Sequence, residues 1–228
     1  MIVDIKIINE SSLIIYFGNE ITPENGALVS QACNIILKQL SSIVIDYIPS
    51  YCSLHLSFDI SRVNILSIRT DIQNILNCQQ SIASVDSDLV IEIPSYYDVE
   101  VGLDLNNVAE ESGLSIKEVI ESHSQVIYQV YAIGFAPGFA YMGNVDKGIS
   151  LPRKKTPRTK VPKGSIAIAE SQTAIYPTES PGGWHILART PIELIDFNSE
   201  NLTPLSVGNR VKFVPINRIE YLKMGGVL

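Results

Sequence analysis

The sequence predicts an α+β protein in two parts, a small two-layer α/β sandwich at residues 1–84 followed by a mostly β domain at residues 85–228. Glycine and proline, which break regular structure, gather after residue 100, since only two of the fourteen glycines and three of the twelve prolines come before it. The net charge of −7 lies entirely in residues 1–99, which hold eleven acidic residues against four basic ones. Two parts of such different composition are expected to fold as separate domains.

The first part of the chain has a ββαββα pattern. Runs of apolar and β-branched residues predict two hairpins, with strands at 2–8, 13–17, 43–48 and 52–58. Between the hairpins, apolar residues keep a helical period from Leu28 to Leu40, and Pro23 suits the first turn of that helix. A second helix is expected over about 63–77. Both helices should cover one face of an antiparallel sheet, with a polar linker near residues 77–88.

The second part begins with a strand at 89–93 and two short helices between residues 105 and 124, which are separated at Gly113. Short strands then alternate with turns rich in glycine and proline, which is typical of a β-barrel or β-sandwich. These strands are predicted at 126–133, 165–169, 173–176, 185–188, 192–197 and 210–215.

Charge and hydropathy exclude several classes of partner. The sequence pI near 5.0 disfavours binding to nucleic acid and to anionic membranes, which select basic surfaces. No apolar run is as long as a membrane span, and no cationic region precedes the apolar start as in a targeting segment. Cys33, Cys52 and Cys78 lack CxxC spacing and are expected to be reduced thiols in the core. We therefore expect a soluble, cytoplasmic protein.

Residues 108–123 have the outline of a helix-turn-helix, with Gly113 at the turn and Ser115 as a cap for the second helix. A recognition helix must approach phosphates, yet this one carries Glu118 and Glu121 against the single Lys117. Two capped helices packed on a barrel are therefore the better interpretation.

The segment GFAPGF is the first candidate site. Gly134, Pro137 and Gly138 break regular structure, so that Phe135 and Phe139 are placed on a loop. Loops are normally polar, so two aromatic residues there either plug the end of the barrel or form the wall of a pocket or an interface. We expect Phe135, Pro137, Gly138 and Phe139 to contact substrate.

A run of cations without any acid follows in an otherwise acidic protein. A solvated loop is the default explanation for such a run, but its prolines stiffen the chain and reduce the entropy lost on ordering around an anion. Arg158 is the best single candidate, because its guanidinium can grip a carboxylate or a phosphate with two parallel hydrogen bonds. The cations are Arg153, Lys154, Lys155, Arg158, Lys160 and Lys163.

The segment SPGGW is the third candidate. Gly182 and Gly183 allow a tight turn that exposes backbone N–H groups to a ligand beside Trp184, the only tryptophan, although a single tryptophan is also common in a core. Polar side chains just upstream could act as uncharged donors. They are Gln172, Thr173 and Tyr176.

Several catalytic motifs are missing. The sequence has no GxSxG, P-loop, Rossmann glycine pattern or HExxH. His55, His123 and His185 are not spaced as metal ligands on one element, so no metal site is expected. His123, at a predicted helix end, could act as a catalytic base or could cap the helix. Hydrolysis by this chain alone is therefore not expected.

Several spaced motifs together resemble one family. They are SYCSLHLSFD in the first domain and VIESHSQVIYQVYAIGFAPGFAYMG, TPRTKVPKGSIAIAESQTAIYP and SPGGWHILARTP in the second. They resemble the family of allophanate hydrolase subunit 1 and of the subunit designated B of the bacterial ATP-dependent 5-oxoprolinase, which includes an inhibitor of a sporulation histidine kinase. Two departures are Ala188, where family members usually have glycine, and the segment after YMG, which is poorer in glycine.

The resemblance implies a first α+β domain and a cyclophilin-like β-barrel. It also implies a subunit that is inactive alone and that opens 5-oxoproline to L-glutamate with subunits A and C. The assembled complex would hydrolyse ATP with the help of Mg²⁺. This chain would not bind ATP tightly. The small carboxylate substrate and the phosphate would both need cations, which Arg158 could supply, with His123 as the candidate base.

Two other functions are compatible with these residues. The same exposed aromatic residues could bind a sensor histidine kinase and inhibit it. Carbamoyl or urea-derived chemistry, which the name allophanate hydrolase suggests, ranks last, because the chain lacks a serine-rich amidase signature.

Overall fold

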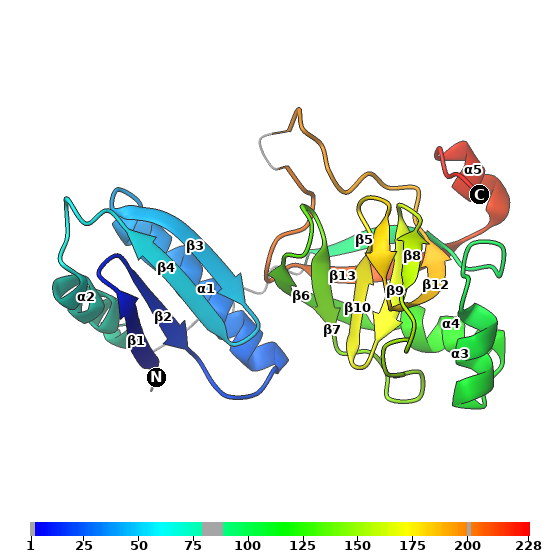
Figure 1. Cartoon of the computed structure of the whole chain (residues 1–228), viewed down its shortest axis with the longest axis horizontal. Helices are drawn as coiled ribbons and strands as arrows, with labels where there is room; N and C mark the ends of the chain where they lie inside the picture. Colours follow the sequence, from blue (N-terminus) through cyan, green and yellow to red (C-terminus); the bar gives the residue numbers. More distant parts are fainter. Residues whose placement is uncertain (1–2, 79–88, 200–201) are drawn as a thin grey trace. The chain divides into compact units, whose positions relative to one another are not determined.

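The computed structural model describes residues 3–78, 89–199 and 202–228 (Figure 1). The chain forms two compact units, Met1–Ser87 and Asp88–Leu228. The domain boundary that the sequence predicts, between residues 84 and 85, lies outside the described residues.

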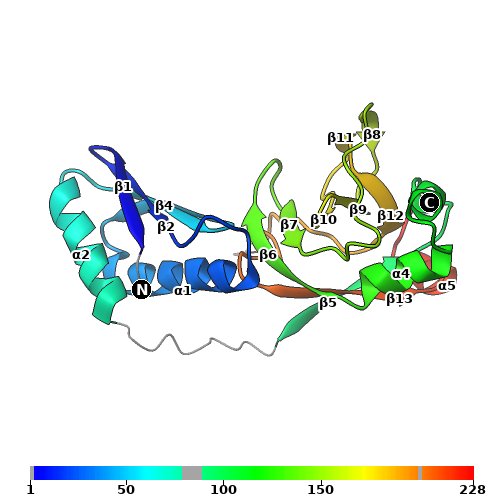
Figure 2. The same ribbon diagram turned by 90° about the horizontal axis from the view of Figure 1, so that it is seen from below.

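The N-terminal unit is a two-layer α/β sandwich, and the predicted ββαββα order is confirmed. Its strands form one antiparallel sheet in the order β1-β2-β4-β3, and Figures 1 and 2 show both helices on the same face of that sheet. Leu13 pairs with Leu56 and Ile15 with Leu54, so that the two central strands direct alternate side chains into a fully buried core. The elements are β1 (Asp4–Asn9), β2 (Ser12–Tyr16), α1 (Pro23–Leu40), β3 (Val44–Ser50), β4 (Ser53–Phe58) and α2 (Ile65–Cys78).

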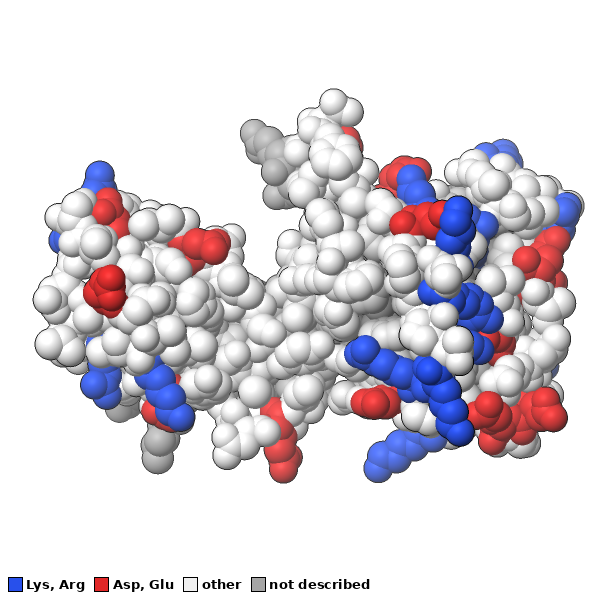
Figure 3. Space-filling view, viewed as in Figure 1, with Lys and Arg blue, Asp and Glu red and all other residues white. Residues whose placement is uncertain are grey.

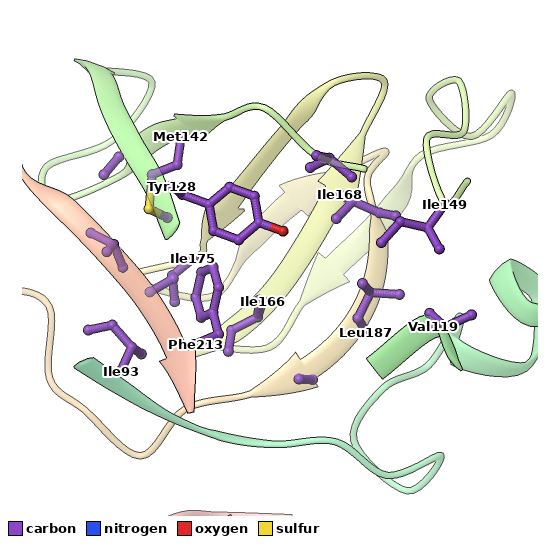
Figure 4. Packing of buried hydrophobic residues seen from close by; sticks show 14 of the residues in the cluster. Ile93, Val119, Tyr128, Met142, Ile149, Ile166, Ile168, Ile175, Leu187 and Phe213 are labelled. Atoms are coloured by element: carbon purple, nitrogen blue, oxygen red, sulfur yellow. The ribbon is translucent and has the colours of Figure 1, made fainter. Parts of the chain in front are cut away.

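The C-terminal unit is a closed barrel, which confirms the predicted mostly β domain. Seven strands follow one another around it in the order β10-β7-β6-β13-β5-β12-β9, and Figure 4 shows their apolar side chains pointing into the interior. Strands β8 (Arg158–Val161) and β11 (Ser180–Gly182) form a separate two-stranded sheet. The barrel strands are β5 (Val90–Tyr96), β6 (Ile127–Ile133), β7 (Ala140–Gly143), β9 (Ser165–Ala169), β10 (Gln172–Ile175), β12 (His185–Arg189) and β13 (Arg210–Ile216).

Helices α3 (Leu105–Ser112) and α4 (Ile116–Ser124) pack on strands β12 and β13. Gly113 ends α3 in the left-handed conformation with φ of 67°, as its position between the two helical patterns predicts. Ser115 and Glu118 form a reciprocal capping box at the start of α4. A further helix, α5 (Arg218–Lys223), was not predicted from the sequence.

Two predictions of secondary structure are wrong. Residues 192–197 form no strand, because the backbone turns back on itself: the N–H of Asp196 donates to the carbonyl of Leu202, and Phe197 is 84% exposed. Ser180–Gly182 is a strand paired with β8 instead of a tight turn. Strands β7, β8 and β11 were not predicted as strands, because three or four residues show too little alternation in the sequence.

The cysteines are free thiols, but only one of them belongs to the core. Cys33 is buried on α1, and burial raises the pKa of its thiol to about 11. Cys52 is half-buried and Cys78 is exposed, so the expectation of three core thiols is confirmed only for Cys33.

A buried polar network crosses the barrel interior at His123. The hydroxyl of Thr173 donates to the carbonyl of Ala167, at 3.1 Å, so it must accept from Nε2 of His123 at 2.9 Å. Nε2 therefore carries the proton, and Nδ1 accepts from the hydroxyl of Tyr97 at 2.6 Å. The imidazole is fully buried and stacks on Phe213 with ring centroids 4.8 Å apart, and this burial favours its neutral form.

This network predicts that the protein loses stability in acid through His123. Burial lowers the pKa of His123 to about 3, whereas a histidine in the unfolded chain titrates near 6.5. The unfolded state therefore binds the proton first, and the contribution of His123 is complete above about pH 6.5 and is lost as the pH falls toward 3. The loss approaches about 1.4 kcal/mol per pH unit in that window.

Urea unfolding of the wild type and of the variant His123→Gln at several values between pH 7 and pH 4.5 measures this effect. The free-energy difference between the two proteins should shrink as the pH falls, because the variant has no group to protonate at this position. A difference that is the same at every pH would contradict the assigned neutral imidazole.

Candidate functional site

Five aromatic side chains form one cluster on the C-terminal unit, which we call the aromatic cluster. Phe139 is its centre and is 2% exposed, and all its neighbours meet it edge to face. The ring centroids lie 4.9 to 5.9 Å from that of Phe139, for Phe135, Tyr141, Tyr176 and Trp184.

The loop between β6 and β7 divides its two phenylalanines between core and surface. Phe139 packs into the buried side of the cluster, as the barrel-plug interpretation expects for that residue. Phe135 instead is 65% exposed and holds a left-handed backbone with φ of 70°, which costs about 1–3 kcal/mol for a residue other than glycine. Gly138, with φ of 76°, brings the loop close to the backbone of Leu194, where an added Cβ would lie 2.7 Å from the carbonyl oxygen. The loop thus holds a large apolar ring in water in a strained conformation.

A buried carboxylate lies at the centre of the basic residues. The Asp104 side chain is 3% exposed and accepts hydrogen bonds from both terminal nitrogens of Arg158, at 2.7 and 2.8 Å. Nζ of Lys154 donates to the same carboxylate at 2.6 Å, and the N–H of Ile186 donates at 2.8 Å. Burial alone would raise the pKa of Asp104, but these hydrogen bonds outweigh burial and lower it. Asp104 therefore stays ionised and fixes two cations.

The backbone before α3 explains how Asp104 reaches this position. Asp104 is the residue that precedes α3, where a side chain would normally cap the helix, but it makes no such bond. Gly102 lies so close to β12 that an added Cβ would be 2.3 Å from the carbonyl oxygen of Leu187. This close approach lets Asp104 exchange hydrogen bonds with the backbone of Ile186 on β12.

The predicted run of cations separates into groups with different partners. Lys160 pairs with Glu179 and Lys163 with Glu193, at exposed positions where an ion pair stabilises little. Lys154 and Arg158 share Asp104. The guanidinium of Arg153 lies 5.7 Å from the centre of the Trp184 ring. Figure 3 shows Lys and Arg side chains gathered on one face of the C-terminal unit, over β8, β9 and β12.

Tyr176 connects the aromatic cluster to the cations. Burial raises the pKa of its phenol, and the positive charges of Arg153 and Arg158 oppose that rise. Its hydroxyl lies where a Cβ on Gly182 would be, at 2.3 Å, which explains the glycine in strand β11. Gly183 accepts a hydrogen bond from the N–H of Lys154, so SPGGW is joined to the cationic segment.

The structure thus brings most of the predicted site residues together, but not all. Phe135, Phe139, Tyr176 and Trp184 share the aromatic cluster, Pro137 and Gly138 shape its loop, and Gly182, Gly183 and Arg158 border it. His123 and Thr173 bond to each other inside the barrel instead, and Gln172 lies half-buried on β10 opposite Gly143. Sequence reasoning missed Asp104, Tyr141 and the role of Arg153. A single aspartate before a helix suggests only a cap, so no sequence signal distinguishes Asp104.

Two features are absent from the described residues. In residues 3–78, 89–199 and 202–228, no three His, Cys, Asp or Glu side chains are grouped as metal ligands would be. None of the helices in these ranges is both long enough and apolar enough to span a membrane.

Comparisons of the sequence with known proteins identify one matching family model and several related proteins. The family model described as "Carboxyltransferase domain, subdomain C and D" matches residues 3–205. The 5-oxoprolinase subunit designated B of Bacillus subtilis is 34% identical over 232 residues, which cover 95% of this chain and 94% of that protein. The subunit of the same name from Haemophilus influenzae is 45% identical over 124 residues, which are 54% of this chain and 58% of that protein.

Solved structures share the fold of this chain. A conserved uncharacterized protein from Pyrococcus horikoshii is 37% identical, with a TM-score of 0.58 over 96% of this chain and 100% of the other. The protein TTHA0988 is 32% identical with a TM-score of 0.81, and this chain spans only 40% of its length. The urea carboxylase of Kluyveromyces lactis, at 14% identity and a TM-score of 0.70, shares the fold. The chain therefore belongs to the carboxyltransferase-domain family, subdomains C and D, together with the 5-oxoprolinase subunits designated B.

Proposed function

We propose that this chain is a non-autonomous subunit of a cytoplasmic, ATP-dependent 5-oxoprolinase that opens 5-oxoproline to L-glutamate with subunits A and C. The relative from Bacillus subtilis that matches nearly the whole chain carries the name of a subunit of this enzyme. The observation that carries the proposal is the aromatic cluster bordered by cations that the buried Asp104 fixes in place. Such a site suits a small molecule that has an apolar ring and a carboxylate.

The chemistry of the substrate explains why ATP is needed. An unstrained lactam is a poor electrophile, so phosphorylation of its carbonyl oxygen by ATP creates a leaving group. Water then adds to the activated carbon, the ring C–N bond breaks and the nitrogen takes up a proton. Ring opening leaves the phosphate on the new carboxyl group as an acyl phosphate, and a second water hydrolyses this bond, so two waters are consumed. Glutamate, ADP and phosphate are the products.

This chain contributes binding and orientation to that reaction. The cations bind the substrate carboxylate, and the half-buried ring of Tyr141 at the edge of the aromatic cluster covers an apolar face of the substrate. We do not assign His123 as the base, because it is fully buried and its Nδ1 accepts from Tyr97. The base and the ATP site belong to the assembled complex. A role as a kinase inhibitor is not favoured, since three curated relatives carry the name of the enzyme subunit.

Reconstitution tests this proposal directly. We expect the chain alone to release neither glutamate nor phosphate from 5-oxoproline and ATP, and the chain coexpressed with subunits A and C to release both. The absence of 5-oxoproline-dependent turnover from the complete set would end the proposal.

The exchange Arg158→Ala should lower the turnover of the assembled enzyme at least about tenfold. The variant loses charge-assisted hydrogen bonds to Asp104 and one cation of the site, and such bonds contribute about 1.5–3 kcal/mol each. Arg158→Lys, which keeps the charge but not the two parallel bonds, should have an intermediate effect. Lys160→Ala, which removes an exposed cation of the same segment, is the control. A folded Arg158→Ala variant with wild-type turnover would place the anion site elsewhere.

Phe135 should bind a partner subunit. Because Phe135 is exposed and its backbone is strained, Phe135→Ala should change the stability of the isolated chain by less than about 1 kcal/mol. The dissociation constant for the partner designated C should rise at least about tenfold, as is usual for a central interface aromatic residue. Phe197→Ala removes another exposed ring as a control. Calorimetric titration measures both variants, and equal affinities would remove Phe135 from the interface.

A further inference from the structure

We propose that Arg153, supported by Trp184, is the residue that binds the anionic group of the ligand, and that Arg158 is a positioning residue behind it. The identity of the ligand rests on the proposed function. The existence of the anion site does not, because it follows from the partners of each cation.

The contacts of the cations in this segment single out Arg153. Asp104 accepts two of the five N–H donors of Arg158 and also holds Lys154, while Lys160 and Lys163 are paired with glutamates. Within the described ranges, Arg153 has neither an ion pair nor a hydrogen bond, although it is part of the same segment. Lys155 also has neither an ion pair nor a hydrogen bond within the described ranges, but Arg153 is the unpaired cation that lies against a ring of the aromatic cluster.

Contact with the tryptophan holds this free charge in place. The Arg153 guanidinium lies 5.7 Å from the centre of the Trp184 ring, within the range of a cation–π interaction. Such a contact orients the guanidinium without neutralising it and uses none of its N–H donors. Trp184 itself is 5% exposed and is fixed by Phe139 and Tyr141 on its edges. The ring is a rigid support, so little entropy is lost when the arginine binds an anion.

The surrounding charge favours an anion at this position. Lys154 and Arg158 share the single negative charge of Asp104, and Arg153 has no acidic partner within the described ranges, so two positive charges of these three residues remain uncompensated. Arg153 lies over Trp184, and Arg158 pairs with Gly182, which lies against the Tyr176 hydroxyl, so both arginines border the aromatic cluster. A ligand bound by Arg153 would therefore place its anionic group near Arg158 and its apolar part against the rings.

The ligand class is a small carboxylate or phosphoryl compound, because a guanidinium fork matches the planar pair of oxygens in either group. A carboxylate on a compact apolar ring, as in 5-oxoproline, can also contact the aromatic cluster, whereas inorganic phosphate can use only the cations. Comparing the affinities for 5-oxoproline and for inorganic phosphate identifies whether the site prefers a carboxylate or a phosphoryl group.

The single tryptophan makes binding measurable in the isolated chain. Trp184 is the only tryptophan of the protein and lies next to Arg153, so its fluorescence should change when an anion binds. We expect a saturable change with 5-oxoproline, a weaker one with inorganic phosphate, and none with chloride at the same ionic strength. In Arg153→Gln the apparent Kd should rise at least about tenfold, which corresponds to about 1.4 kcal/mol.

Matched variants separate the arginine from its neighbours. Arg153→Lys should lie between wild type and Arg153→Gln, because lysine keeps the charge but loses the fork. Lys155→Gln, which removes an exposed cation two positions away, should bind like the wild type. A substitution at Arg153 can itself change the fluorescence of Trp184, so the Kd of each variant is also measured by calorimetric titration. Thermal unfolding checks that each variant is folded.

The outcomes of these experiments test the anion site at Arg153 separately from the proposed 5-oxoprolinase activity. A wild-type chain that binds neither probe saturably, or an Arg153→Gln variant with wild-type affinity, overturns the role of Arg153. Binding that depends on Arg153 without turnover in the complete set of subunits overturns only the 5-oxoprolinase assignment. In an active complex, Arg153→Gln should raise KM for 5-oxoproline more than it lowers kcat, and an unchanged KM again overturns the anion site.

Discussion

The buried carboxylate of Asp104 is the constraint on which the candidate site depends. An ionised carboxylate that is almost fully buried is tolerated only when it is paired and hydrogen-bonded, and here it receives four hydrogen bonds from Lys154, Arg158 and the backbone of Ile186. Asp104 and these partners come from three segments that are far apart in the sequence. The same charge therefore fixes the start of α3, the cationic segment and β12 in one arrangement.

The aromatic cluster provides the complementary part of the site. Phe139 and Trp184 are buried and rigid, whereas Phe135 is exposed on a strained turn that the hydrogen bond from the N–H of Gly134 to the carbonyl of Phe139 holds in place. Strain of this kind is retained in proteins mainly where it serves a function. The cluster and the cations meet at Arg153 and Trp184, where a free positive charge lies beside apolar rings.

Much of the fold could be predicted from the sequence, because hydrophobic period and turn residues act locally. Pro23, Gly113 and Ser115 marked helix ends that the structure confirms, and the strands of both units have enough alternating residues to be recognised. Residues 192–197 show the limit of this reasoning, since their alternation resembles a strand but no neighbouring strand pairs with them. Strand formation depends on partners that the local sequence does not specify.

The residue types of the candidate site could be predicted from the sequence, but the contacts between them could not. The loops rich in glycine, proline and aromatic residues indicated where the site lies, and Arg158 was recognisable as a cation on a stiff segment. The pairing of Arg158 with Asp104 spans 54 residues and leaves no local trace, so the sequence could not show that Arg158 was already engaged and Arg153 was not. His123 appeared to be a possible base for the same reason, because its burial depends on the closed barrel.

A crystal structure of the chain with 5-oxoproline at saturating concentration tests the central claim most directly. The account predicts the ligand carboxylate on the guanidinium of Arg153, the ligand ring against the aromatic cluster, and Arg158 still paired with Asp104. Density for the ligand at a different surface, or an Arg158 that has left Asp104 to bind it, would contradict the account.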